Sequence, residues 1–144
     1  MACPFFMPLE RFGDGAWSHP TRLPLGSGWR GLCTSEIAIS PPDDHTIQER
    51  CNLGYALECP NFPAVREFDA VRFSVSKCLN GVVTLSFVCE RDHRPVQHGT
   101  VDFSRIDQRW ISSHADPRIQ KMADCYLDSY LRKNNAAELS ATAG

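Results

Sequence analysis

The chain has 144 residues, with 15 basic and 17 acidic side chains and a formal net charge of −2 at pH 7. This length favours a single domain, and the absence of a Lys/Arg block argues against a nucleic-acid-binding or membrane-surface protein. No apolar run approaches the roughly 18 residues of a membrane-spanning helix. The first residues, MACPFFMPLERFGDG, lack the basic start and long apolar stretch of a secretory signal. We therefore expect a cytoplasmic protein that contacts neither nucleic acid nor membrane.

Residues 1 to about 42 are expected to be ordered but irregular. Six of the ten prolines and five of the nine glycines fall there, and no helical or strand periodicity lasts more than a few residues. Disordered segments are poor in aromatic residues, whereas this one carries Phe5, Phe6, Phe12, Trp17 and Trp29. A long irregular segment of this kind needs a cross-link or a metal to hold it onto the rest of the domain.

A helix is predicted after the Pro41-Pro42 pair. Asp43 and Asp44 can cap the positive end of a helix that runs through HTIQERCNLGYAL. Its apolar positions recur four residues apart and form one face, which consists of Ile47, Cys51 and Tyr55.

Three strands of an antiparallel meander follow. Apolar and polar residues alternate in VRFSVSKC and VVTLSFVCE, and a third strand near GTVDF points Val101 and Phe103 inward. Between the first two strands lies Leu79-Asn80-Gly81. A two-residue Asn-Gly turn would place the two apolar rows on opposite faces, so we predict a three-residue loop with Gly81 in the left-handed conformation.

A long helix is predicted to begin at Asp116-Pro117, with the aspartate as N-cap and the proline at the first helical position. Residues 134–144 read as a flexible tail. The predicted fold class is therefore α+β, an antiparallel three-stranded meander packed by a C-terminal helix. One domain spans residues 1–133, with a loop-rich, cysteine-bearing part at 1–63 and the sheet and helix at 68–133.

Seven cysteines are many for a reducing compartment, where cysteine clusters more often indicate metal or redox chemistry than disulfides. Cys89 is in phase with the apolar row of its strand, and Cys125 flanks the apolar stripe of the predicted helix, so both are expected in the core. Cys78 lies beside a turn on the polar row and is expected to be exposed.

The other four cysteines lie in the loop-rich part, separated by 29, 17 and 7 intervening residues, and are Cys3, Cys33, Cys51 and Cys59. Cys3 and Cys59 each precede a proline, which fixes φ and turns the chain away from the sulfur. A Cys-Pro step also ends the cluster-binding run of bacterial ferredoxins, and four thiolates complete the ligand set of an iron–sulfur cluster or a structural zinc ion.

The spacing favours a cluster, most simply [4Fe–4S], over zinc. Zinc sites usually contain two short C-x₂₋₄-C knuckles, and none occurs here, whereas separate loops can each reach one corner of a cluster. If a helix continued from Cys51 to Cys59, their α-carbons would be about 12 Å apart. We therefore expect the helix to end before Cys59, near Gly54 or at Glu58-Cys59-Pro60.

The stretches MACPFFMPLER, GWRGLC, CNLGYALECPNFP, AVRFSV and ERDHRPVQHG resemble a small family of uncharacterised bacterial proteins of similar length. The resemblance covers residues 1 to about 133. Its anchors are the same four cysteines together with the GYA and CP steps, and it implies no catalytic residues.

Three functions follow from these patterns. A cluster protein would act in electron transfer, redox sensing or as a structural staple, with a possible redox partner protein. A hydrolase or transferase could use Cys89, His93 or His98 of CERDHRPVQHG, but a turn histidine is the simpler interpretation and no catalytic motif occurs. A metal-free interaction module could use Trp17 and Trp29 as anchors. The favoured prediction is the cluster protein, with zinc as the alternative metal and with no enzymatic activity of its own.

Overall fold

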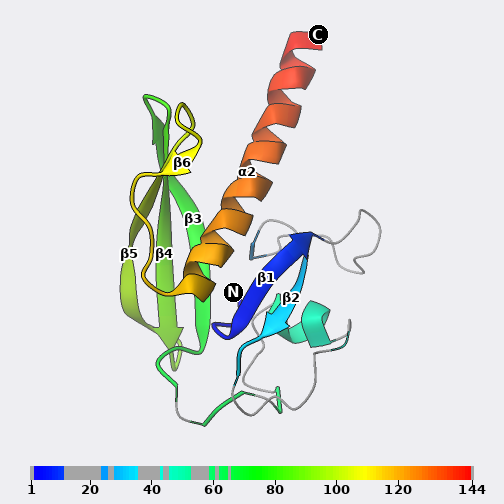
Figure 1. Cartoon of the computed structure of the whole chain (residues 1–144), viewed down its shortest axis with the longest axis vertical. Coiled ribbons are helices and arrows are strands. Elements are labelled where there is room, and N and C mark those ends of the chain that lie inside the picture. Colours follow the sequence, from blue (N-terminus) through cyan, green and yellow to red (C-terminus); the bar gives the residue numbers. More distant parts are fainter. Residues whose placement is uncertain are drawn as a thin grey trace.

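A computed structural model of the chain describes residues 2–11, 24–25, 28–35, 43, 46–52, 59–60, 62–64 and 66–143, with only the backbone described for 48–49 and 134–143. Four antiparallel strands form a meander in the order β3 (Ala70–Leu79), β4 (Val82–Arg91), β5 (Arg94–Ser104) and β6 (Arg109–Trp110). Helix α2 (Pro117–Ala143) lies between this sheet and a second, two-stranded sheet of β1 (Phe6–Arg11) and β2 (Trp29–Cys33) (Figure 1). The predicted α+β class is confirmed, and β6 adds a short fourth strand.

The turn between β3 and β4 differs from the prediction. Leu79 pairs with Val82, so the turn has two residues, Asn80 and Gly81, with φ of 54° and 77°. Positive φ at both central positions is the geometry that fits the twist of a tight hairpin. The apolar rows nevertheless share one face, because the register shifts between Val75 and Lys77. This bulge supplies the change of parity that we had assigned to a three-residue loop, and that loop prediction was wrong.

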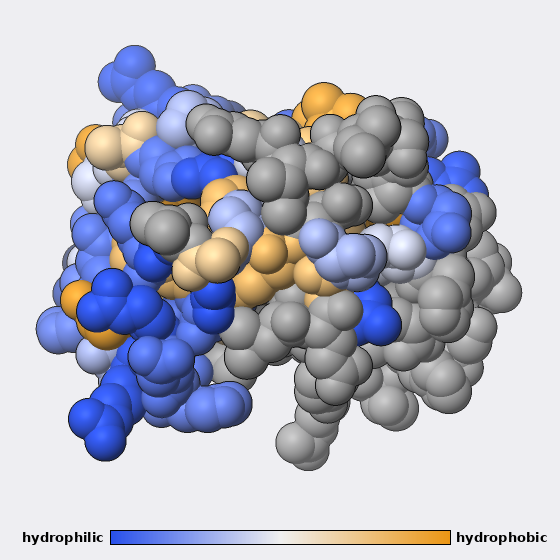
Figure 2. Space-filling model, turned by 90° about the horizontal axis from the view of Figure 1, so that it is seen from below, coloured by the Kyte–Doolittle hydropathy of each residue, from blue (hydrophilic) through white to orange (hydrophobic). Residues whose placement is uncertain are grey.

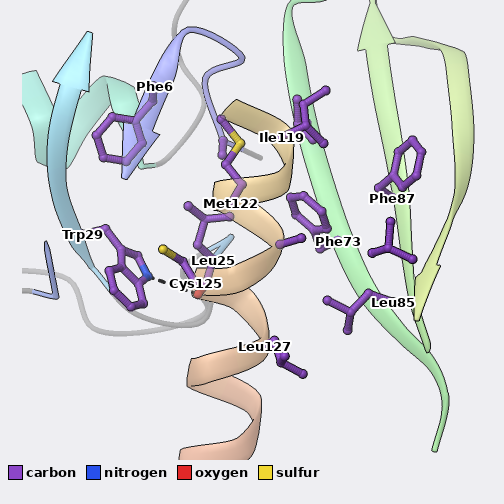
Figure 3. Packing of buried hydrophobic residues seen from close by; sticks show 14 of the residues in the cluster. Phe6, Leu25, Trp29, Phe73, Leu85, Phe87, Ile119, Met122, Cys125 and Leu127 are labelled. Carbon is purple, nitrogen blue, oxygen red and sulfur yellow. Dashed lines mark hydrogen bonds between the residues drawn. The ribbon is translucent and has the colours of Figure 1, made fainter. Parts of the chain in front are cut away.

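The core lies on both sides of α2 (Figure 3). Toward the four-stranded sheet the helix packs against alternating strand residues, among them Phe73, Leu85 and Phe87. Its other side faces Leu25, Trp29 and Phe6. Val101 and Phe103 are buried, as predicted. Apolar surface removed from water contributes about 25 cal/mol per Å², so burial on two sides stabilises the packing of α2 between the two sheets.

Helix α2 begins directly after a capping residue, Asp116, and extends to Ala143. Asp116 Oδ1 accepts a hydrogen bond from the Arg118 backbone N–H at 2.9 Å, and the helix begins at Pro117, which confirms the predicted N-cap. The sequence predicts an apolar stripe on this helix that consists of Ile119, Met122, Ala123, Tyr126, Tyr130 and Leu131. The first three are each 1% exposed or less, and the other three are partly buried against the core. Helical backbone continues to Ala143, through the segment expected to be a tail.

The N-terminal part is more regular than the sequence predicts. β1 and β2 pair antiparallel across the intervening chain, with a register shift between Pro8 and Glu10. Gly31 permits the close approach, because a Cβ there would lie 1.9 Å from the Met7 carbonyl oxygen. The register shift in β1 interrupts its alternation after Pro8, so the sequence does not mark the strand, and the expectation of an irregular wrap fails at these residues.

The predicted first helix is present as a single π-helical turn, η1 (Ile47–Cys51). The N-cap of η1 is Thr46, whose side chain makes no capping hydrogen bond, so the structure does not show the predicted cap at Asp43; Asp43 Oδ1 instead accepts a hydrogen bond from the Thr46 N–H at 2.7 Å. Asp44 lies outside the described residues. Gly54 and Tyr55 lie outside the described residues. No helix in the described part of the chain is both long and apolar enough to cross a membrane. In the view of Figure 2, hydrophobic residues lie in the middle of the face, beside hydrophilic ones.

Candidate metal-binding site

The four cysteines singled out by their spacing line one pocket. Cys3, Cys33, Cys51 and Cys59 form its walls together with Phe5, Phe6 and Phe62 and the more polar Ser35, Thr46 and Arg50. The pocket lies at the ends of β2 and η1 and beside the residues that lead into β1. Four segments of the chain therefore each contribute one cysteine to the wall of the same pocket.

Backbone hydrogen bonds hold the first two cysteines. The Cys3 N–H donates to the Cys51 carbonyl at 3.1 Å, which joins the start of the chain to the end of η1. The Phe6 N–H donates to the Cys3 carbonyl at 3.1 Å and closes a turn before β1. Cys33 ends β2 directly opposite Phe6 in the β1–β2 register. The pairing of β1 with β2 thus sets Cys33 beside Cys3.

The other two cysteines lie on either side of a segment outside the described residues. η1 ends at Cys51, and Cys59 is not helical, so the two do not share one uninterrupted helix. The Phe62 N–H donates to the Cys59 carbonyl at 3.0 Å, which makes a turn around the Cys-Pro step. Phe62 packs edge-on against Phe5, with ring centroids 5.6 Å apart. This aromatic contact holds the Cys59 turn against the Cys3 loop.

Asn52 is a positioning residue that the sequence patterns did not reveal. Its side chain is buried and exchanges two hydrogen bonds with the Trp29 backbone, accepting from its N–H at 3.1 Å and donating to its carbonyl at 2.9 Å. The amide also donates to the Ile47 carbonyl at 2.9 Å. The Asn52 side chain therefore ties the end of η1, where Cys51 lies, to the start of β2, which leads to Cys33.

The two most buried thiols of the pocket are neutral at physiological pH. Burial raises the pKa of Cys3 from 9.0 to about 12, and the nearby Cys33 and Cys59 raise it further. Burial is also the main cause that raises the pKa of Cys51, followed by the other three thiols. The mutual influence of the four groups shows that they share one electrostatic environment. Binding of a metal here must release these protons.

Arg118 borders the same region from α2. Its guanidinium lies 5.2 Å from the centre of the Phe5 ring, and it interacts electrostatically with Cys3. Arg118 Nη1 donates to Thr34 Oγ1 at 3.3 Å, and that hydroxyl donates to the Phe5 carbonyl at 2.7 Å. A chain of hydrogen bonds thus connects the N-terminus of α2 with the residues that follow Cys3 and Cys33.

The donor set fits soft metal chemistry. Among the described residues, the pocket lining offers four cysteine sulfurs and no carboxylate or imidazole, and four such sulfurs are the ligand set of iron–sulfur clusters and of Cys₄ zinc sites. Its cavity volume is about 20 Å³, close to the space that one water molecule requires. No group of three or more His, Cys, Asp or Glu among the described residues is arranged around a single ion position. The side chains must therefore rearrange to hold either a cluster or a zinc ion. The type of donor atom fits both centres, whereas the present positions of the sulfurs do not.

The remaining cysteines are placed as the sequence predicts. Cys89 and Cys125 are buried and Cys78 is exposed, and none of them lines the pocket. Burial raises the pKa of Cys125 to about 12 and that of Cys89 to about 11. These two thiols are packing residues.

The alternatives based on histidine and tryptophan receive little support. Cys89 is fully buried, whereas His93 lies exposed in the β4–β5 turn and His98 is exposed on β5. A buried thiol and exposed histidines do not form a nucleophile–base pair. Trp29 is in the core and its indole N–H donates to the Leu25 carbonyl at 3.4 Å (Figure 3), so it is not a surface anchor. Trp17 lies outside the described residues.

Comparison with known proteins adds no assignment. The chain matches no protein-family model, no curated protein and no solved structure.

Proposed function

We propose that the protein binds a metal centre through Cys3, Cys33, Cys51 and Cys59, and that this centre is a [4Fe–4S] cluster. The observation that carries the proposal is the meeting of four thiols, from four separate segments, at one pocket. The bacterial family that the chain resembles has the same four cysteines as its anchors, and we infer that the chain belongs with it.

Four thiolates would saturate the iron atoms of a cubane and leave no position for a substrate. The proposal therefore favours electron transfer, redox sensing or a structural role, in a compartment that keeps thiols reduced, such as the cytoplasm. Bound there, the cluster would supply one-electron redox chemistry. Phe5, Phe6 and Phe62 in the pocket walls limit the access of water, one of the factors that sets a cluster's reduction potential. An electron-transfer role would also require a redox partner protein.

Zinc is the alternative, since the same four sulfurs form the ligand set of a structural Cys₄ site. Purification without oxygen separates the two. Brown protein with four iron and four sulfide per chain supports the cluster, and colourless protein with one zinc per chain supports the alternative. Folded protein that takes up neither metal after reconstitution refutes both and leaves the metal-free interaction module.

The cysteine assignment is tested by a pair of variants matched for burial. Cys51 and Cys125 are both buried and both have a pKa raised by burial, but only Cys51 lines the pocket. We expect Cys51→Ala to abolish stoichiometric metal binding and Cys125→Ala to retain it. Exposed Cys78→Ala should also retain it. Equal loss in all three variants would show that metal uptake depends on general stability and not on these four ligands.

A further inference from the structure

A second cavity adjoins the cysteine pocket and has different chemistry. Its volume is about 260 Å³, and it is lined by Pro4, Phe5, Arg66, Glu67, Phe68 and Arg118. Phe5 belongs to the walls of both cavities. The space is much larger than that among the thiols and admits a small organic molecule. Three apolar residues and two guanidinium groups make up most of its wall.

Arg66 is held rigidly on one side of this cavity. Its Nε donates to Asp69 Oδ1, and its Nη1 donates to the Pro63 and Ala64 carbonyls at 2.9 and 3.2 Å. The guanidinium also stacks 4.6 Å from the centre of the Phe62 ring. Because these contacts already fix the Arg66 side chain, binding of a ligand costs little further side-chain conformational entropy.

Arg118 is held in the same manner from α2. Its Nε and Nη2 donate to the two oxygens of Asp116 at 3.2 and 2.9 Å, and its Nη1 donates to Thr34. The two arginines therefore enter the cavity from separate elements, and each is oriented by an aspartate and an aromatic ring.

Both guanidinium groups retain hydrogen-bonding capacity. A guanidinium has five N–H donors, and the bonds above engage three in Arg66 and three in Arg118. Two donors thus remain on each, and no acceptor in the described part of the chain receives them. On Arg118 the two donors are one N–H of Nη1 and one of Nη2, which can pair with the two oxygens of a carboxylate, whereas on Arg66 both are on Nη2, which can donate to one carboxylate oxygen.

The charge balance and the walls select the type of oxyanion. Asp69 and Asp116 already offset the two positive charges, and exposed Glu67 adds a negative charge at the cavity. A multiply charged ion such as phosphate is therefore disfavoured, whereas Pro4, Phe5 and Phe68 offer contact to a hydrocarbon chain. We propose that this cavity binds a small organic monocarboxylate, with the carboxylate on Arg66 and Arg118 and its apolar part against Phe5 and Phe68.

Titration of ¹⁵N-labelled protein with sodium butyrate, at constant ionic strength set with sodium chloride, tests the proposal. We expect saturable shifts of the amides around Phe5, Arg66, Phe68 and Arg118. Sodium phosphate should produce weaker shifts at the same concentration. Linear, unsaturable shifts, or phosphate that binds as tightly as butyrate, would overturn the proposal.

Three variants sharpen the test. Glu67→Gln removes an exposed negative charge that repels a carboxylate in the cavity, and it leaves both arginines in place. The variant should bind butyrate about two- to fivefold more tightly. Arg118→Gln should weaken it at least tenfold. Its control is Arg132→Gln, because Arg132 also pairs with an aspartate on α2, Asp128, but does not line the cavity. If Arg118→Gln does not fold, Glu67→Gln still decides, since an unchanged affinity in that variant refutes the site.

The butyrate titration is independent of the metal centre. Failure to bind butyrate leaves the cysteine assignment intact, and metal-free protein that binds butyrate leaves the carboxylate site intact.

Discussion

The Asn52 side chain offers the sharpest test of how the site is held together. In Asn52→Ala three hydrogen bonds are lost, two with the Trp29 backbone and one with the Ile47 carbonyl. At about 1 kcal/mol for each bond, the free energy of unfolding should fall by about 3 kcal/mol. The Trp29 N–H and carbonyl would then be buried without a partner, which places the loss at the upper end of the usual range.

Urea denaturation followed by circular dichroism measures this loss. For a chain of this size, about 3 kcal/mol corresponds to a fall in melting temperature of about 6–12 °C. Ser74→Ala is the control, because Ser74 is exposed on β3, and its cost should stay within about 0.5 kcal/mol.

Asn52→Asp isolates the donor half of the amide. The carboxylate can still accept from the Trp29 N–H, but it would meet the Trp29 and Ile47 carbonyls where the amide now donates. The variant should be destabilised at neutral pH and recover part of the loss in acid, where a protonated carboxyl can donate once. If Asn52→Ala costs no more than Ser74→Ala, or if Asn52→Asp is as stable as the wild type at pH 7, the assigned role of the amide is refuted.

Three further predictions concern packing and pH. Gly31→Ala should lower the free energy of unfolding, measured by urea denaturation, by about 1–3 kcal/mol or more, because the new Cβ would clash with the Met7 backbone. Gly99→Ala should cost less, because the new Cβ would meet only the Phe87 ring, at 3.0 Å, and no backbone atom; equal costs would contradict the close approach at Gly31. Met122→Ala should cost about 2–5 kcal/mol, since Met122 is fully buried, and a loss below 1 kcal/mol would contradict its place in the core. In metal-free protein, Cys3 keeps its proton between pH 9 and about 12 while the unfolded chain loses it. Stability should therefore fall across that range by up to about 1.4 kcal/mol per pH unit more than in Cys3→Ala, and parallel pH profiles of the two proteins would contradict the raised pKa.

Local patterns were sufficient for the central strands and for α2. Alternation in β3, β4 and β5 depends on the two faces of a sheet, and the Asp116-Pro117 cap depends on the first turn of one helix, so each is expressed within a few residues. The hairpin turn was predicted wrongly because a bulge in a strand changes the face of the sheet on which the following side chains lie. The extra residue Ser76 corrects the register five residues before Gly81, the end of the turn, where nothing in the alternation marks it.

The residues of the candidate site likewise divide into those that local sequence patterns identify and those that only long-range contacts reveal. Cysteine chemistry and Cys-Pro steps identified four residues, because thiols are rare and their possible roles are few. Asn52, Thr34 and Arg118 were missed, because their roles depend on contacts with residues 23, 29 and 84 positions away along the chain.

By itself, the sequence determined the α+β class, the position of the main strands and helix, and the four thiols to be considered together. Each of these follows from side-chain type and short-range spacing. Only the tertiary structure decided that β1 pairs with β2, that α2 is buried on two sides, and that the four thiols line one pocket next to a cavity with two arginines. These features arise when distant segments pack together, and the free energy of such packing comes from surfaces that no single segment contains.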